Sequence, residues 1–512
     1  MMNTQLIAAE YIEKLLRYGI ENELIYQLDI PQIRNQLMDL LNVIEPYQDA
    51  ETVITEELKD ILLVLLDYAV SIHLIRGTIT ERDLLDSKIM AQLLPRQSEI
   101  SRIYEDLQTS KGKISATDYF YRLCQSSNYI RMDRIIKNLH WITSTEYGDM
   151  EITVNLSKPE KDPTEIAAQK DAPMLDYPRC LLCLENVGYA GRLNHPGRSN
   201  HRVLPITLDK ETWYFQYSPY VYYNEHAIIF SELHRPMSIS RKTFVRVLDF
   251  VEQLPHYFIG SNADLPIVGG SILSHDHFQG GHHVFPMEKA GVIKEFSNPR
   301  YRNTKIKMIK WPLSVIRLTS NNKNELIDLA TSILDAWRQY NDTENSILSH
   351  TGEVPHNTIT PIARINVLKE WELDLTLRNN RTNETCPDGI FHPHQHLHHI
   401  KKENIGLIEV MGLAVLPPRL EQEMVQIEDV LTGRLNIEEA VKIDSLQKHA
   451  LWMRDLVERY GTNQTEEIAK KLLREEVGKK FTQVLECSGV FKQDQQGLEA
   501  FEKFINLCVE LK

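Results

Sequence analysis

The segment from Gly269 to Gly281 constrains the fold most, because it places polar side chains at alternate positions between glycines. His275, His277 and Gln279 would share one face of an extended strand, since successive side chains of a strand point to opposite faces. The flanking glycines would let a charged ligand approach the backbone, because glycine has no Cβ. The structural alternative is a buried strand whose histidines only satisfy each other, but burying unpaired polar groups costs free energy. The alternation therefore favours a phosphate-transfer surface.

Length, charge and cysteine content restrict the class of protein. A chain of 512 residues exceeds what one hydrophobic core usually covers, so we expect several structural units. A net charge of −14 argues against a nucleic-acid partner, because that binding depends on clustered Lys and Arg. Six scattered cysteines indicate a reducing compartment. Without a signal-peptide pattern or a membrane-spanning apolar run, we expect a cytoplasmic protein that does not bind a membrane.

Apolar periodicity predicts a helical region, a mixed region and a second helical region. Residues 4 to about 142 show helical spacing, and a short alternating strand at 152–156 is followed by a proline-containing linker at 157–163. Two strand and helix successions then follow, each ending in a histidine-alternating strand, at 275–279 and at 392–396, and the last part is a solvent-facing helical tail. We therefore expect an α+β fold with two similar half-domains and antiparallel sheets. The predicted units are 1–165, 166–295, 296–425 and 426–512.

Two groups of side chains have the spacing of metal ligands. Cys180 and Cys183 match a zinc knuckle, which needs two further ligands, and His234 and His275 are candidates. A redox dithiol or a pair of packing cysteines has the same spacing, although the glycine-rich sequence that follows favours a loop over the helix expected of a redox motif. The alternating histidines from 392 to 398 predict a second imidazole-rich site on a strand face.

A basic loop stands out in this acidic chain. It contains Arg192, Arg198 and Arg202, and arginine forks suit phosphate oxygens. A solvated charged loop explains the same residues, so both interpretations stay open.

The sequence His275-Asp276-His277-Phe278-Gln279 resembles the histidine-triad superfamily, in the transferase branch whose third position is glutamine. Together with Cys180, Cys183 and the Ser231–His234 segment, it is similar to the galactose-1-phosphate uridylyltransferases of Gram-positive bacteria. The resemblance covers about residues 165–425. The family's proline between the two histidines is Asp276 here, which leaves the local turn open.

The resemblance implies uridylyl transfer from UDP-glucose to galactose 1-phosphate through a covalent uridylyl-histidine, in a homodimer. It implies that His277 is the nucleophile and that Gln279 holds the phosphoryl oxygen. It further implies a structural zinc ion on Cys180, Cys183, His234 and His275. The implied substrate-binding residues are Ser271, Ser274, Asn262, Arg192, Arg198, Arg202, Met411 and Gly412, with residues 410–412 forming a strand beside the uridine. A second metal ion, iron or zinc, would correspond to Glu288, His356, His394 and His396.

The implied roles agree with the chemistry of the side chains. Imidazole titrates near pH 6.5, so a large fraction is an uncharged nucleophile at neutral pH. A glutamine at position 279 donates hydrogen bonds but delivers no proton, which favours transfer over hydrolysis. The alternatives are a nucleotide hydrolase or phosphorylase of the same superfamily, which would favour histidine at 279, and a non-catalytic protein that binds zinc and nucleotide.

Overall fold

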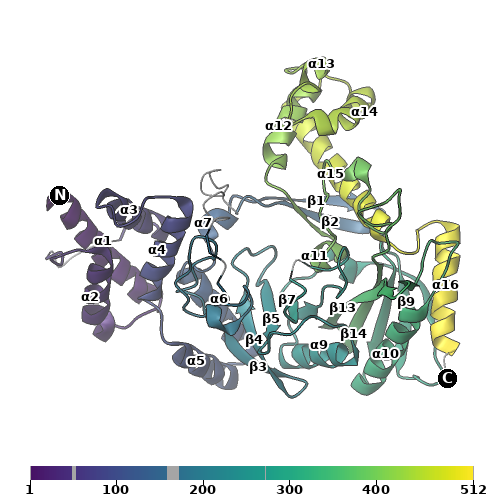
Figure 1. The fold of residues 1–512 in the computed structure, drawn as a ribbon, viewed down its shortest axis with the longest axis horizontal. Coiled ribbons are helices and arrows are strands. Elements are labelled where there is room, and N and C mark those ends of the chain that lie inside the picture. The colour runs from purple at the N-terminus through teal and green to yellow at the C-terminus, as the bar shows by residue number, and fades with distance from the viewer. Residues whose placement is uncertain (1, 49–53, 158–171, 174, 271, 511–512) are drawn as a thin grey trace.

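A computed structural model describes residues 2–48, 54–157, 172–173, 175–270 and 272–510 (Figure 1). Ser271 and the predicted linker beyond Ser157 lie outside the described residues. None of the helices in the described part of the chain is long and apolar enough to cross a bilayer.

A ten-stranded sheet forms the centre of the molecule, and all of its paired strands are antiparallel. In spatial order the strands are β3 (Leu204–Leu208), β4 (Glu211–Tyr217), β5 (Ala227–Ser231), β7 (His277–Gly281), β6 (Phe258–Gly260), β13 (Asn357–Ile365), β14 (Trp371–Asn379), β10 (Val315–Ser320), β9 (Thr304–Ile309) and β8 (Val292–Phe296). The α+β expectation is confirmed.

The strand order repeats about the junction between β6 and β13. From the outer edge inward, the first half runs β3, β4, β5, β7, β6, and the second half runs β8, β9, β10, β14, β13. In each half, one long helix follows the third strand in chain order and precedes the fourth. Two short strands of the second half, β11 (His350–Thr351) and β12 (Val354–Pro355), form a separate sheet and are not counted here. The expected duplication is therefore present, and β14 is the counterpart of β7.

The predicted histidine-alternating strand at 392–396 is wrong. Residues Gln395–Leu397 form a 3-10 helix, and the chain around them is irregular. Pro393 has no N–H to donate to a ladder, so it opposes strand pairing at this place.

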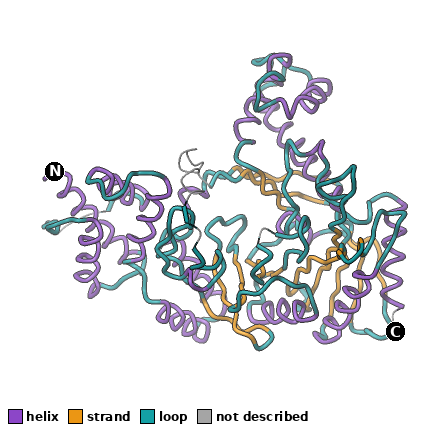
Figure 2. Tube along the Cα trace, viewed as in Figure 1, coloured by secondary structure: helices purple, strands orange, loops and turns teal. Residues whose placement is uncertain are grey.

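Two helices, α9 (Arg241–Gln253) and α10 (Lys323–Gln339), cover one face of the sheet (Figure 2). Phe278 belongs to the apolar core that contains these helices and stacks on Trp213 with ring centroids 5.0 Å apart. Because strand side chains alternate, His277 and Gln279 lie on the opposite face. Packing of Phe278 thus fixes the direction of the two polar side chains beside it.

The N-terminal region is helical, as expected. Its helices are α1 (Met2–Glu21), α2 (Ile30–Leu41), α3 (Leu58–Ser71), α4 (Ile79–Ala91), α5 (Gln97–Ser110), α6 (Lys113–Ser126) and α7 (Met132–Ile135). The helical pattern ends before the predicted residue 142, because β1 (Leu139–Thr145) pairs with β2 (Gly148–Val154).

The C-terminal region is helical and keeps charged residues such as Lys470 and Lys471 exposed, as expected, but it also packs an apolar face on the rest of the molecule. Its helices are α11 (Leu407–Val410), α12 (Leu420–Leu431), α13 (Ile437–Ala440), α14 (Ala450–Tyr460), α15 (Glu466–Ser488) and α16 (Gln495–Glu510). Helix α15 buries Leu473, Val477 and Phe481 against the small sheet formed by β1, β2 and β15 (Leu413–Leu416). Phe504 of α16 packs on Trp337 of α10, with ring centroids 5.2 Å apart.

Candidate active site and metal centre

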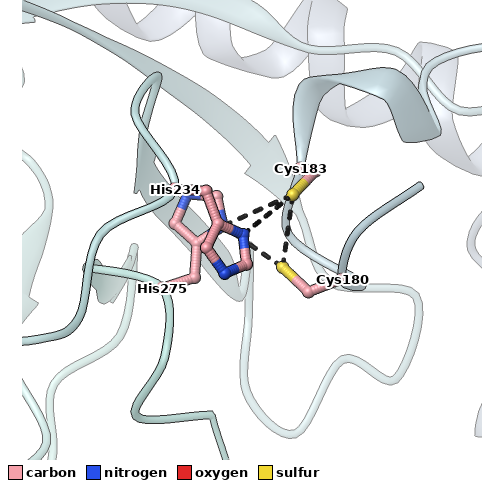
Figure 3. A group of neighbouring side chains, drawn as sticks. All are labelled: Cys180, Cys183, His234 and His275. Carbon is pink, nitrogen blue, oxygen red and sulfur yellow. Dashed lines mark hydrogen bonds between the residues drawn. The ribbon is translucent and has the colours of Figure 1, made fainter. Parts of the chain in front are cut away.

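Two cysteines and two histidines converge beside the start of β7 (Figure 3). Their donor atoms all lie within 4.8 Å of one another. The sulfur of Cys180 lies 3.2 Å from Nδ1 of His275, and the sulfur of Cys183 lies 3.2 Å from Nδ1 of His234. The two sulfurs are 3.5 Å apart. The predicted ligands are thus gathered in space, although they come from three separate segments.

The surroundings of this cluster suit a metal ion. Nε2 of His275 lies 2.8 Å from the carbonyl oxygen of Ser231, so Nε2 carries the proton and Nδ1 is free to bind metal. Asn186 donates to the carbonyl oxygens of both Cys180 and Cys183 at 2.8 Å and holds their turn. Two thiols and two imidazoles form the donor set of a tetrahedral Cys₂His₂ site. The cluster could therefore hold a metal ion, whereas a redox dithiol needs no imidazoles directed at its sulfurs.

His277 begins β7 and is 7% exposed. Its Nδ1 lies 2.8 Å from the carbonyl oxygen of His275. A carbonyl only accepts hydrogen bonds, so Nδ1 carries the proton and Nε2 keeps its lone pair. Burial lowers the pKa of His277 to about 4, which keeps the ring uncharged at neutral pH. The backbone therefore presents a neutral imidazole with an available nitrogen.

Gln279 lies on the same face, two residues further along β7. Its Oε1 lies 3.2 Å from Nε2 of His226, a buried residue just before β5. His226 was not among the predicted site residues. No local motif marks it, and its neighbourhood depends on the pairing of Ala227 with Gly280, which brings residues 53 positions apart together.

Asp276 lies between His275 and His277, where the resemblance implied a proline. Its carboxylate faces Arg246 at 3.4 Å and Arg235 at 3.5 Å, and its backbone N–H donates to the carbonyl oxygen of Arg235 at 2.7 Å. Its own carbonyl oxygen accepts from Ser231 at 2.9 Å. Ion pairs and backbone hydrogen bonds thus hold the turn between the metal cluster and His277.

The arginines of the basic loop make contacts within the protein. Arg198 donates to the hydroxyl of Tyr129 at 2.8 Å. Arg202 donates to the backbone carbonyl of Pro95, and Arg192 donates to Asn194. These contacts connect the loop to itself and to the N-terminal helices, and the expected phosphate contacts of the three arginines stay a prediction.

The remaining expected substrate residues occupy different environments. Asn262 is buried, and its Oδ1 accepts from the N–H of Leu407 at 2.9 Å, whereas Ser274 is exposed. Met411 and Gly412 form the turn between α11 and β15, so the expected strand at 410–412 is wrong. Gly412 has a φ of +100°, a conformation that side chains with a Cβ rarely adopt.

The structure does not gather the residues expected for a second metal ion. Both ring nitrogens of His356 contact protein groups, Asn380 and Thr351, at 2.8 Å. The rings of His394 and His396 are 6.3 Å apart, and the carboxylate of Glu288 lies 3.8 Å from Arg364. Among the described residues, the cluster around Cys180 is the single group with metal-binding geometry. The strand expected to align His394 and His396 is absent, and the second metal ion stays a prediction.

Comparison with known proteins assigns the family. The N-terminal domain of galactose-1-phosphate uridyl transferase matches residues 33–236, and its C-terminal domain matches residues 250–452. A galactose-1-phosphate uridylyltransferase of Caldanaerobacter subterraneus is 54% identical over 511 residues, with 98% of each chain covered. The chain belongs to the galactose-1-phosphate uridylyltransferase family.

Other members of the uridylyltransferase family show the same full-length similarity. The enzyme of Fusobacterium nucleatum is 52% identical over 97% of this chain and 98% of its own, and that of Bacillus subtilis is 47% identical over 97% of each. A yeast Ap4A phosphorylase structure matches 64% of this chain with a TM-score of 0.33 and 12% identity, too distant to inform the fold or function. The resemblance and the nucleotidyltransferase class are thus confirmed, and the family match extends well beyond the expected residues 165–425.

Proposed function

We propose that this protein exchanges uridylyl between UDP-glucose and galactose 1-phosphate, with His277 as the nucleophile. The supporting observation is the hydrogen bond from Nδ1 of His277 to the carbonyl oxygen of His275, which leaves Nε2 unprotonated. A neutral imidazole with one free nitrogen needs no additional base to attack phosphorus.

The reaction has two balanced steps. The lone pair on Nε2 of His277 attacks the uridylyl phosphorus, and the bond to the bridging oxygen breaks, so that glucose 1-phosphate leaves with the electron pair. A phosphate oxygen of galactose 1-phosphate then attacks the same phosphorus. The phosphorus–nitrogen bond breaks, its electron pair returns to Nε2, and UDP-galactose is released. No proton has to be donated to a phosphate leaving group whose second pKa is near 6.

Gln279 supports transfer over hydrolysis in this proposal. Its amide can donate to a phosphoryl oxygen in both steps, and it has no proton to deliver to a leaving group. The hydrolase alternative would favour an imidazole at this position.

Zinc on Cys180, Cys183, His234 and His275 would act as a structural cross-link. The cluster holds the turn through His275, whose backbone carbonyl orients His277. Zinc would supply rigidity here and no step of the exchange.

We also propose that the active form is a homodimer, which light scattering of the purified protein tests.

Mass spectrometry of the intact protein tests the proposal. Brief incubation with UDP-glucose alone should add one uridylyl group, and peptide mapping should place it on His277. Addition of galactose 1-phosphate should remove the group and yield UDP-galactose. Release of free UMP without an adduct would favour the hydrolase, and binding of UDP-glucose without any chemistry would favour the non-catalytic alternative.

A further inference from the structure

We infer that His226 is a positioning residue that sets the amide orientation of Gln279, a role that rests on the function proposed above. An amide side chain can present either its oxygen or its NH₂ group to a ligand. Only the NH₂ group can stabilise negative charge on a phosphoryl oxygen. Some neighbour must therefore select the orientation, and the contact at 3.2 Å between Nε2 of His226 and Oε1 of Gln279 makes this selection.

The surroundings of His226 determine which ring nitrogen carries the proton. Nδ1 of His226 is buried and contacts no hydrogen-bond partner among the described residues. A proton on Nδ1 would leave a buried donor unpaired, and such donors are rarer in proteins than under-satisfied acceptors. The proton therefore belongs on Nε2, which donates to Oε1 of Gln279. The NH₂ group of Gln279 is then left to face the site. Burial also lowers the pKa of His226 to about 4, so the ring stays neutral.

The glycines that follow Gln279 make this contact feasible. A Cβ at Gly281 would lie 2.7 Å from the ring of Tyr223 and 2.9 Å from the carbonyl oxygen of Glu225. The turn that carries His226 therefore lies directly over residue 281 and requires glycine there. The hydroxyl of Tyr223 donates to the carbonyl oxygen of Gly280 at 3.1 Å. Gly281 thus admits the turn, whereas Gly280 admits the backbone of β6, because a Cβ there would lie 2.8 Å from the carbonyl oxygen of Phe258.

The position of His226 is held from several sides. Its N–H donates to the carbonyl oxygen of Tyr223 at 3.2 Å, and its carbonyl oxygen accepts from Ser218 at 2.7 Å. The ring packs against those of Tyr222 and Tyr223, with centroids 5.5 and 4.5 Å away. A side chain held in this way can orient Gln279 before substrate binds.

Two substitutions that introduce side chains of similar length provide the central test. His226→Gln keeps an N–H donor, and His226→Met removes it. We expect the single-turnover rate of uridylyl-protein formation to fall about 10-fold in His226→Met, less than the ~10²–10³-fold loss typical when a stabilising donor is deleted, because Gln279 remains present. His226→Gln should recover only part of the rate, because its amide can donate to Gln279 but can also accept from it. The affinity for UDP-glucose should change less than 2-fold in both variants.

A double-mutant cycle separates this role from simple packing. In a Gln279→Ala background, His226→Met should change the rate less than 2-fold, because the residue on which it acts is gone. His201→Leu, which alters a buried histidine stacked on Tyr129, serves as a control for packing loss. Additive effects in the cycle, or equal rates for the Gln and Met variants, would overturn the inference.

Nitrogen NMR of histidine-labelled protein gives a readout that does not depend on turnover. The resonances of His226 are those that disappear from the spectrum of His226→Gln. In the wild-type protein they should show a protonated Nε2 and an unprotonated Nδ1. The opposite tautomer would overturn the inference even if the enzyme is active. An absent uridylyl adduct in the wild-type protein, together with the expected tautomer, would instead count against the proposed function alone.

Discussion

The two halves of the ten-stranded sheet share their strand order but carry different chemistry on the face opposite the helices. On β7 this face presents His277 and Gln279, whereas its counterpart β14 presents Glu372 and Asp374. Asp374 is 0% exposed and accepts from Arg317 at 2.6 and 2.9 Å and from Arg364 at 2.8 Å. The first half thus keeps a neutral imidazole with a free nitrogen, and the second half fills the corresponding surface with paired charges.

This difference shows how a duplicated fold can divide its tasks. The arginines Arg317 and Arg364 offset the effect of burial and hold the pKa of Asp374 below its usual value, so the carboxylate stays ionised and fully engaged. An engaged ion cluster fixes its strand but has no group left for a substrate. A neutral imidazole on the other half costs less to bury and keeps a reactive lone pair.

The largest expected effect is on the first half. His277→Gly should lower exchange at least 10³-fold, because no other nucleophile lies on β7, and coupled detection of UDP-galactose measures this. Thr376→Val, on the counterpart strand β14, should leave turnover within about 2-fold. A comparable loss in both variants would show that the two halves share the chemistry.

We expect a metal ion in the first half of the sheet region and none in the second. The purified protein should contain one zinc per chain, and Cys183→Ser should lose it because a tetrahedral site needs its fourth ligand. Elemental analysis gives the stoichiometry. Cys487→Ser, which lies outside the cluster, should retain the metal. Two zinc ions per chain in the wild-type protein would support the second metal site.

The ion cluster of the second half should act on stability. Asp374→Asn should lower the free energy of unfolding by about 3–5 kcal/mol, because it leaves two buried arginines with too little negative charge. Asp328→Asn, which removes the same charge from an exposed pair with Arg241, should cost less than about 1 kcal/mol. Urea denaturation compares the two variants, and equal losses would refute a special role for burial.

The histidine-rich loop of the second half should respond to pH. Burial lowers the pKa of His399 to about 3, and its Nδ1 lies 2.8 Å from Nδ1 of His449. The unfolded chain takes up a proton near pH 6.5 and the folded chain does not, so stability falls as the pH decreases from about 6.5 toward 3. At pH 5 this group should cost about 2 kcal/mol relative to pH 7.

Thermal denaturation of the wild type and His399→Gln at both pH values checks this contribution. The variant should lose less stability on acidification. The same pH dependence in both proteins would assign the effect to other groups.

The smallest effect is expected at two residues that the resemblance implies as ligands of a second metal ion. His394→Ala and His396→Ala should leave zinc content unchanged and turnover within about 2-fold, since their rings do not converge. Loss of bound metal in either variant, measured by elemental analysis, would contradict the structure.

The sequence predicted the first half better than the second, for physical reasons. Alternation around His277 and the Cys180 to Cys183 spacing are local patterns. The alternation predicted a strand that contains His277 and Gln279, but β7 begins at His277, so His275 precedes the strand and does not share its face. The cysteine spacing predicted a cluster whose other ligands only folding brings together. His226 depends on strand register across 53 residues, which no local pattern encodes. The alternation at 392–396 was misleading, because Pro393 and the 3-10 helix after it override a two-residue period. The burial of the charged residues on β14 could not be predicted from the sequence, because acidic and basic residues are usually exposed.

The small sheet of β1, β2 and β15 limits which fragments of the chain can fold by themselves. β15 runs parallel to β2, so residues 413–416 need residues 151–154 as their neighbours. A fragment beginning after Val154 would uncover the edge of β15 and the apolar side of α15 at once. We therefore expect that the two segments matched by the family domains do not fold independently, and that a fragment lacking residues 151–154 is prone to aggregate.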